Sequence, residues 1–365
     1  MVKIEEIVSF LDEFAPLNFQ ESYDNSGFLV GDKDKTVTKI LTCLDCTRVV
    51  IEEAIKKNCN LIVCHHPPIF KPIKKILSSE PLGELLIKAI KNDISIYACH
   101  TNLDKIKSGV NYKIAEKLGM QNVKTLQEES GLLTKITVFI PKENADLVLK
   151  EMFAAGAGKI GNYSECSFQV SGIGTFTPNE LANPTIGEKN KAEKVEEIRV
   201  EVLVPEHLSE KVLNKMKTAH PYEEVAYYHQ KLENLHQEVG LGVIGELEKE
   251  LTEDEMLASV KNVFNLPYIR HSEKINKKIK KVAICGGAGS SLIKLAIKKN
   301  ADCYITADTK YHDFFEANGK ILFIDIGHYE SEQYTIELFC DVLSKKFPNI
   351  AVLCTEIITN PVKYA

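Results

Sequence analysis

The order of predicted strands and helices constrains the fold of this chain more than any other feature. In residues 1–128, short apolar strands alternate with amphipathic helices, and the same alternation returns in residues 237–365. Strands that alternate with helices of about 10–15 residues are typical of βαβ units and of a parallel or mixed sheet. Both ends of the chain are therefore predicted to be α/β.

Residues 129–236 follow a different order. The predicted strands cover residues 133–140, 164–170, 197–204 and 225–230, and the predicted helices cover 143–153 and 208–217. This β-α-β-β-α-β order is that of the ferredoxin-like unit. A polar stretch rich in Asn, Lys and Glu, residues 178–193, is predicted to be a loop between the second and third strands.

We therefore predict a mixed-sheet α/β core built from both chain ends, residues 1–128 and 237–365. An inserted ferredoxin-like domain, residues 129–236, interrupts this core. A β-α-β-β-α-β unit has its ends near each other, so it is suited to insertion at a surface loop. Two separate α/β halves that flank a linker domain are the alternative.

Charge and hydropathy exclude several broad classes of protein. Apolar residues make up 44% of the 365, enough to bury a core, so a mostly disordered chain is not expected. Lys plus Arg total 45 against 51 Asp plus Glu, and this net charge of −6 does not favour nucleic-acid or membrane binding as the main function. The N-terminus lacks a signal-peptide pattern, and no apolar stretch approaches the roughly 18–20 residues of a membrane span. We therefore expect a cytoplasmic protein.

Several histidines directly follow predicted strands of the α/β segments. We expect the strands that precede these histidines to belong to one sheet. Ligands of open α/β sheets bind beyond the carboxyl ends of the strands. The histidines are His65 and His66 after strand 61–64, His100 after strand 94–99, and His328 after strand 321–326.

Carboxylates stand near these histidines at a spacing that suits a metal site. His328 and Glu332 are four residues apart, as are His100 and Asp104, so each pair shares one face of a helix. Imidazole and carboxylate together favour zinc, iron, manganese or cobalt over calcium. The adjacent histidines point in opposite directions on an extended backbone, so each can serve a different ion. Two ions about 3.5–4 Å apart would need a bridging carboxylate, from Asp104 or Glu332.

A hydrogen-bonded or capping role is the ordinary alternative for any one of these histidines. The set as a whole nevertheless predicts a metal site, because all its members follow strands of one α/β pattern. His100 is its weakest member. It can instead orient Asp104, or a water, from outside the coordination sphere.

Other polar segments are weaker candidates. The glycine-rich turn at residues 286–291 can cradle an anion on its backbone amides or be a simple strand-to-helix turn. Asp308 and the pair His312-Asp313 follow strand 303–306, and they can support the metal site, contact substrate or lie solvated in a loop. The segment 220–224 can contact a partner or form a structural turn.

The motifs in combination identify a family. The chain resembles the Nif-three-like dinuclear-metal-centre proteins, which are often described as homologues of a type 2 GTP cyclohydrolase I. The resemblance covers the whole chain and is carried by Asp24-Asn25-Ser26-Gly27, Leu44-Asp45-Cys46-Thr47, His65-His66-Pro67, His100-Thr101-Asn102-Leu103-Asp104, and Gly327-His328 through Glu332.

The resemblance implies a mixed α/β core, two divalent metal ions per chain and a ring-shaped homohexamer. It implies that the middle of the chain is similar to PII and CutA-type modules. By matching positions, the implied metal ligands are His65, His66, Asp104, His328 and Glu332. Glu330 is a nearby competitor for the role of Glu332.

The leading functional hypothesis is a metal-dependent hydrolase that acts on GTP or a related purine nucleotide, with His100 carrying a proton. Zinc, iron and manganese all suit the ligands. The alternative is a non-enzymatic, metal-binding regulatory ring whose inserted domain binds a partner or gates the cavity. Nucleic-acid binding is a third hypothesis, and the acidic net charge disfavours it. The lysine runs at 189–194 and 274–281 are interpreted as solvated faces.

Overall fold

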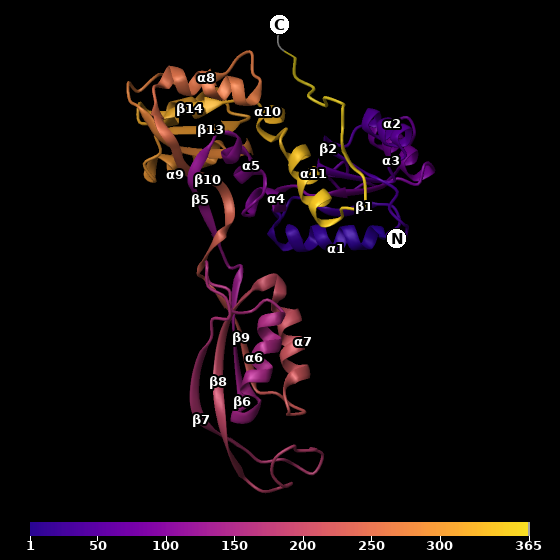
Figure 1. Ribbon diagram of the computed structural model, residues 1–365, viewed down its shortest axis with the longest axis vertical. Helices are drawn as coiled ribbons and strands as arrows, with labels where there is room; N and C mark the ends of the chain where they lie inside the picture. The colour runs from indigo at the N-terminus through magenta and orange to yellow at the C-terminus, as the bar shows by residue number, and fades with distance from the viewer. Residues whose placement is uncertain (364–365) are drawn as a thin grey trace. The chain divides into compact units, whose positions relative to one another are not determined.

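The structure, a computed structural model, describes residues 1–363 and divides the chain into two compact units. The core unit contains residues 1–127 and 238 onward, and the inserted unit contains residues 128–237. The chain passes between them along two long strands, β5 (Met120–Ser130) and β10 (Leu235–Leu251). Figure 1 shows the core unit in indigo to magenta and orange to yellow, and the inserted unit in the colours between.

The first sheet of the core unit has the strand order β1-β4-β3-β2-β15. Its central strands are parallel, and β1 is antiparallel to β4. Apolar faces of α2 and α3 pack on this sheet to form a continuous core, while α11 contacts β2 and β3. The elements are α1 (Ile4–Phe14), β1 (Gly27–Val30), β2 (Ile40–Asp45), α2 (Arg48–Lys57), β3 (Leu61–His66), α3 (Pro81–Lys91), β4 (Ser95–Ala98), α4 (Thr101–Lys105), α5 (Val110–Lys117), α11 (Thr335–Lys346) and β15 (Val352–Cys354).

The second sheet of the core unit has the order β11-β14-β13-β12-β10-β5. The strands β12, β13 and β14 are parallel to one another, whereas β10 and β11 run antiparallel to their neighbours. The remaining elements are α8 (Glu253–Phe264), β11 (Arg270–His271), β12 (Ile279–Ala288), α9 (Ile293–Lys298), β13 (Cys303–Ala307), β14 (Leu322–Asp325) and α10 (His328–Glu332).

The predicted α/β class, built from both chain ends, is confirmed, but the expectation of a single sheet is wrong. Strands β3 and β4, which precede His65 and His100, lie in the first sheet, and β14, which precedes His328, lies in the second. Each sheet instead contains one strand from the other chain segment. Strand β15, from the C-terminal segment, pairs with β2. Strand β5, from the N-terminal segment, joins β10. The histidines therefore meet between two sheets.

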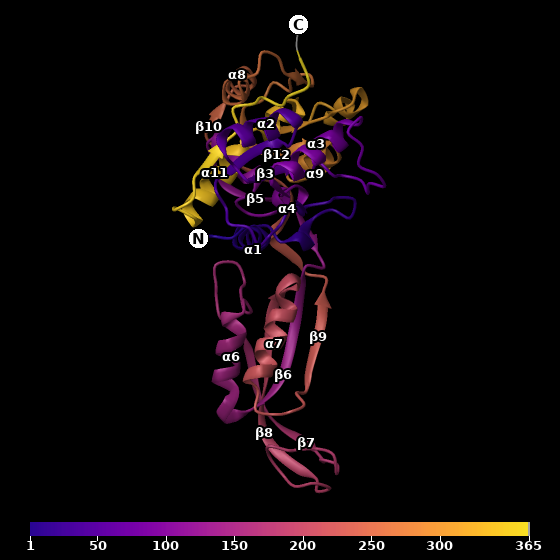
Figure 2. The ribbon, with the colours of Figure 1, turned by 90° about the vertical axis from the view of Figure 1, so that its right-hand side faces the viewer.

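The inserted unit has the predicted β-α-β-β-α-β order. Its antiparallel sheet has the order β7-β8-β6-β9, and α6 and α7 cover one face (Figure 2). Strand β7 begins and ends later than predicted. Its second half was missed because Gly172 and Gly174 weaken the sequence signal there. The elements are β6 (Leu133–Pro141), α6 (Ala145–Ala154), β7 (Phe168–Phe176), β8 (Glu193–Pro205), α7 (Ser209–Ala219) and β9 (Tyr227–Leu232).

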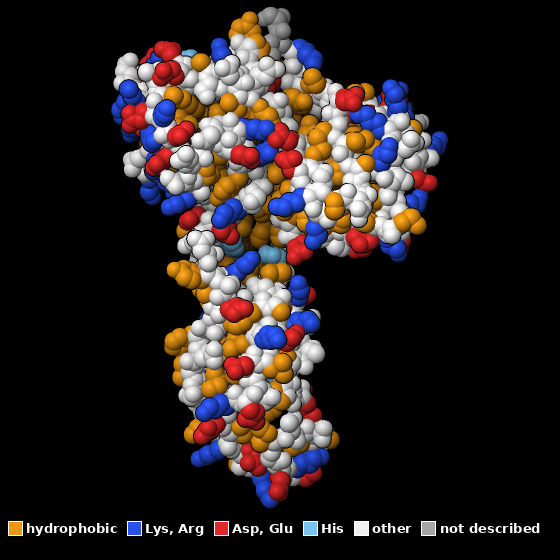
Figure 3. Space-filling view, viewed as in Figure 1, with side chains coloured by type: hydrophobic (Ala, Val, Ile, Leu, Met, Phe, Trp, Pro, Cys, Tyr) orange, Lys and Arg blue, Asp and Glu red, His pale blue; other side chains and the backbone are white. Residues whose placement is uncertain are grey.

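The surface agrees with the modest net charge. On the face shown in Figure 3, positive and negative side chains are interspersed rather than gathered by sign. Within residues 1–363, none of the helices has the length and apolar character needed to cross a membrane.

Candidate metal centre

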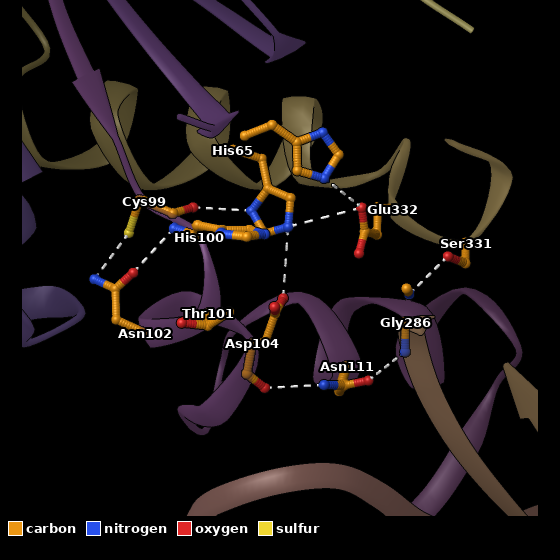
Figure 4. Close-up of polar contacts among 12 residues, drawn as sticks. His65, Cys99, His100, Thr101, Asn102, Asp104, Asn111, Gly286, Ser331 and Glu332 are labelled. Carbon is orange, nitrogen blue, oxygen red and sulfur yellow. Dashed lines mark hydrogen bonds and ion pairs between the residues drawn. The ribbon is translucent and has the colours of Figure 1, made fainter. Parts of the chain in front are cut away.

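The core unit brings all the predicted site residues together. His65 and His66 are the last two residues of β3, so they lie at its carboxyl end. His100 precedes α4, which carries Asp104. His328 and Glu332 are the first and last residues of α10, which follows β14 after Gly327. Figure 4 shows His65, Asp104 and Glu332 pointing toward one another from three different elements.

The donor atoms of these side chains form three overlapping groups in which all atoms lie within 4.8 Å of one another. Glu332 is shared by two of the groups, and so are His65 and His66. The groups are His65–Asp104–Glu332, His66–His328–Glu332 and His65–His66–His100. The shared carboxylate therefore stands between two sets of imidazoles.

The Oε2 atom of Glu332 is the centre of the cluster. It lies 3.0 Å from Nε2 of His66 and 3.1 Å from Nε2 of His328. It lies farther, 3.8 Å, from Nε2 of His65. Nε2 of His65 in turn lies 3.6 Å from Oδ1 of Asp104. Both of these last atoms are buried without a hydrogen-bond partner.

Two buried polar atoms that face each other without partners would be costly in an apoprotein. His65 is completely buried, so water does not compensate for the missing hydrogen bond. A cation between Nε2 of His65 and Oδ1 of Asp104 would satisfy both atoms, since each presents a lone pair when deprotonated. The residues present therefore fit a bound divalent metal.

The other ring nitrogen of each histidine is held by an oxygen acceptor. Because carbonyl and carboxylate oxygens only accept, Nδ1 carries the proton and donates, and Nε2 is turned toward the centre. The acceptors are Cys99 O for His65 (2.8 Å), Asp45 for His66, Asp24 for His100 and Asp308 for His328, the last three at 2.7 Å.

The sequence indicates these orienting carboxylates only in part. Asp308 is a candidate from its position after a strand, whereas Asp24 and Asp45 appear only within the family motifs. A usable signal exists for Asp45, because β2 and β3 are parallel neighbours and Asp45 is in register with His66. Asp24 lies in the loop before β1 and carries no comparable signal, since only tertiary packing brings it to His100.

The electrostatics of the cluster favour protonated rings at His66 and His328 when no metal is bound. Burial opposes protonation of His66, but hydrogen bonds to Asp45 and Glu332 raise its pKa to about 10. The hydrogen bond to Glu332 raises the pKa of His328 to about 9, against the effect of burial. Burial would raise the pKa of Glu332, but hydrogen bonds from the surrounding histidines hold it well below its usual range. Burial raises the pKa of Asp104 to about 7.

The glycine-rich turn at 286–289 packs closely against the cluster. The N–H of Gly286 donates to Asn111 (2.8 Å), and the N–H of Gly287 donates to Oγ of Ser331 (2.9 Å). These amides are therefore used within the protein rather than offered to an anion. A Cβ on Gly287, whose φ is +62°, would stand 2.4 Å from Oε1 of Glu332. Only glycine allows the carboxylate to lie this close to the backbone.

A cavity of about 800 Å³ opens beside the cluster. His66, His100 and His328 line it, whereas His65 and Asp104 do not. The cluster thus has one accessible side and one closed side. Phe70, Tyr268 and Arg270 also border the cavity, and Arg270 is held by Asp325 at 2.6 Å.

The remaining weaker candidates lie elsewhere. Asp313 accepts from the N–H of Lys310 within a short helical turn and takes no part in the donor-atom groups of the described residues. His220, in the inserted unit, donates from Nε2 to the carbonyl of Phe139 at 2.9 Å, which is a structural contact.

Comparisons with known proteins identify the family of this chain. A family model described as Duf34/NIF3 (NGG1p interacting factor 3) matches residues 2–361. A Bacillus subtilis protein named GTP cyclohydrolase 1 type 2 homolog is 37% identical over 98% of this chain and 97% of its own length. A Halalkalibacterium halodurans protein of the same name is 40% identical over 84% of this chain and 83% of its own length. The crystal structure of a Bacillus cereus protein related to NIF3 is similar with a TM-score of 0.87, at 37% identity, over 100% of this chain and 99% of that chain.

Proposed function

This chain belongs to the Duf34/NIF3 family, and from that premise we propose that it is a metal-dependent hydrolase with two divalent ions per chain. The observation that carries the proposal is the pair of buried, unpartnered atoms His65 Nε2 and Asp104 Oδ1 beside a second set of donors. The two sets share Glu332, as a bridging carboxylate would. Zinc, iron and manganese all accept this combination of imidazole and carboxylate.

The residues divide into two holding sets. His65 and Asp104 would hold one ion on the closed side, and His66 and His328 would hold the other beside the cavity. When bound, the ions would polarise a substrate oxygen and lower the pKa of a water. Five protein ligands leave coordination positions vacant, which favours catalysis over a purely structural site.

The surrounding side chains would bind substrate and move protons. His100 donates its Nδ1 proton to the buried carboxylate of Asp24, and its side chain lines the cavity. This arrangement leaves Nε2 to accept or release a proton during hydrolysis. The rings of Phe70 and Tyr268 would provide surfaces for a flat substrate.

The substrate class that we propose is GTP or a related purine nucleotide. Its support is the printed name of the relatives, GTP cyclohydrolase 1 type 2 homolog, together with the aromatic side chains that line the cavity. The amides of Gly286 and Gly287 give no support, because they donate to Asn111 and Ser331 within the protein. We further propose a ring-shaped homohexamer, on the strength of the family resemblance alone.

A non-enzymatic role is the second candidate, in which the chain is a metal-binding regulator. The separate, compact inserted unit favours it, since such a unit could bind a partner independently of the metal centre.

Metal content and hydrolysis together test the proposal. The full chain, purified without an affinity tag, should contain about two ions and hydrolyse at least one purine nucleotide. The double variant His66→Ala, Glu332→Ala should lose both properties. Two ions without hydrolysis of any nucleotide would favour the regulatory role, whereas one ion or none, unchanged in the variant, would overturn the two-ion site.

A further inference from the structure

Glu330 is a buried carboxylate on the wall of the cavity beside the metal centre, and the proposed metal chemistry does not use it. The residue is only 9% exposed and borders the cavity together with His328. It takes no part in the donor-atom groups of the described residues. His328 and Glu332 share one face of α10, whereas Glu330 is turned roughly 200° from each of them about the helix axis. Glu330 is therefore available to a ligand of the cavity rather than to the metal ions.

The C-terminal segment fixes one oxygen of this carboxylate. Nδ2 of Asn360 donates to Oε1 of Glu330 at 2.8 Å. Asn360 is itself held in place, because its Oδ1 accepts from the N–H of Val362 at 2.9 Å. Within residues 1–363, no Lys, Arg or His forms an ion pair with Glu330, and its Oε2 accepts no hydrogen bond. A carboxylate can accept about four hydrogen bonds, so most of this capacity is left for a ligand.

A carboxylate of this kind is best matched by two N–H donors that lie side by side, since each oxygen can then accept one hydrogen bond. Among purines, the Watson–Crick edge of guanine offers such a pair at N1 and N2. Hypoxanthine lacks the second donor, and adenine presents an acceptor at N1. Phe70 and Tyr268 border the same cavity, so a flat ring would also find an apolar surface there.

An organic cation would also pair with a carboxylate, but the setting of Glu330 disfavours it. His66 and His328, which would hold the ion beside the cavity, line the same space, so a cationic ligand would be repelled by that ion. Arg270, the cation that borders the cavity, lies 2.6 Å from Asp325 and does not occupy Glu330. A neutral edge with two donors is therefore the better match.

We propose that Glu330 recognises the guanine base of a bound nucleotide by accepting hydrogen bonds from N1–H and N2–H. Asn360 is a positioning residue that acts through Glu330, because it fixes Oε1 of the carboxylate. The inference rests on the proposed function, since it names the base that a purine nucleotide in this cavity would carry.

Three nucleoside monophosphates that differ at this edge test the proposal. GMP, IMP and AMP are titrated into the full-length, zinc-loaded protein, and calorimetry gives their dissociation constants. A site built to pair with a donor rejects analogues that lack it, so GMP should bind at least about tenfold more tightly than IMP. AMP should bind no more tightly than IMP. Equal affinities of GMP and IMP, or no binding of GMP, would overturn the proposal.

Matched variants locate the recognition. Glu330→Gln keeps the shape of the side chain but replaces one acceptor by a donor, so the affinities for GMP and IMP should come within twofold of each other. Asp341→Asn, a carboxylate-to-amide change on α11 outside the cavity lining, should keep the preference for GMP. A Glu330→Gln protein that prefers GMP as strongly as wild type does would overturn the assignment.

A third variant covers the case in which Glu330→Gln does not fold. Asn360 lies in the C-terminal segment outside the helices and strands, and Asn360→Ala removes its hydrogen bond to Glu330. This variant should weaken the binding of GMP more than that of IMP. Equal weakening of both nucleotides would overturn the positioning role.

Hydrolysis assays separate this inference from the proposed function. Hydrolysis of GTP, ITP and ATP with similar kcat/KM would support a hydrolase and overturn Glu330 as the residue that selects the base. A tenfold preference for GMP in binding, without hydrolysis of any nucleotide, would support the recognition by Glu330 and overturn the hydrolase.

Discussion

His66 and Asp45 face each other across adjacent parallel strands, and Nδ1 of His66 lies 2.7 Å from Oδ1 of Asp45. The second carboxylate oxygen of Asp45 accepts a hydrogen bond from Thr359 at 2.5 Å. The carboxylate is therefore fixed from both sides, by its strand and by the C-terminal segment. The His66 ring is therefore held in the orientation needed to ligate a metal even when no metal is bound.

Substitution Asp45→Asn should weaken metal binding without removing a ligand. An amide in place of the carboxylate no longer compensates the partial charge of the ligating ring, and such changes usually cost 10–100-fold in metal affinity. Competition against a chromophoric chelator measures the effect. Asp341→Asn, at a carboxylate that is 60% exposed and pairs with Lys113, is the control and should bind as wild type does. An Asp45→Asn affinity within twofold of wild type would contradict the orienting role.

Glu332→Gln should have a larger effect, because Glu332 belongs to two donor groups. We expect the metal content to fall from about two ions per chain to less than one. Glu330→Gln is a close control, since Glu330 is also buried on α10 but binds Asn360 at 2.8 Å. Elemental analysis of the purified variants distinguishes the two. Retention of both ions by Glu332→Gln would remove Glu332 from the site.

Gly287→Ala tests the close packing behind the centre. Both Gly287 and Gly319 have positive φ, +62° and +64°, so alanine at either costs about 1 kcal/mol in backbone conformation. Only at Gly287 does the new Cβ meet Glu332, because Gly319 has no atom within 4 Å of that position. We therefore expect a larger loss of thermal stability in Gly287→Ala than in Gly319→Ala, and a loss of metal content in Gly287→Ala alone. Equal metal content in both variants would contradict this.

The residues of the donor cluster could be predicted from the sequence better than the sheets that position them. His65, His66 and His328 follow apolar strands, and this local signal survives in any arrangement of those strands. Whether β3 and β14 share a sheet depends on long-range pairing, such as that of β15 with β2, which strand periodicity does not encode. The same limit explains Asp24, whose contact with His100 spans 76 residues.

Asp24 is expected to stabilise the fold as well as the site. Burial would raise its pKa, but hydrogen bonds from His100, Thr101 and the backbone of Asn25 hold it well below the usual range. Because the folded-state pKa is lowered, the stabilisation is present above the unfolded value of about 4 and is lost as the pH falls below it.

Asp24→Asn should therefore lower the free energy of unfolding by about 2 kcal/mol at pH 7, and by less at pH 3, where part of the stabilisation has been lost. Urea unfolding at both pH values measures this. Asp34→Asn, at a carboxylate that is 87% exposed, should change neither value. A difference between wild type and Asp24→Asn that does not shrink in acid would contradict the electrostatic account.

Metal binding should release protons, because the metal-free cluster stores them. The pKa of His66 is about 10 and that of His328 about 9, so both rings are protonated at pH 7. A metal binds neutral imidazole, so each ring gives up one proton, and each released proton strengthens apparent binding about tenfold per pH unit. Apparent zinc affinity should thus rise about 100-fold per unit between pH 7 and 8. It should rise more steeply below pH 7, where Asp104, with a pKa of about 7, releases another.

Calorimetry in two buffers of different ionisation enthalpy counts these protons directly. About two should be released per chain at pH 8. Asp308→Asn removes the negative charge beside Nδ1 of His328 and lowers the pKa of that ring, so fewer protons should be released at pH 8 than by wild type. Zinc binding with no proton release at pH 7 would show that the metal-free histidines are already neutral. The hydrogen bonds from His66 and His328 to Glu332 would then not be formed in the metal-free protein.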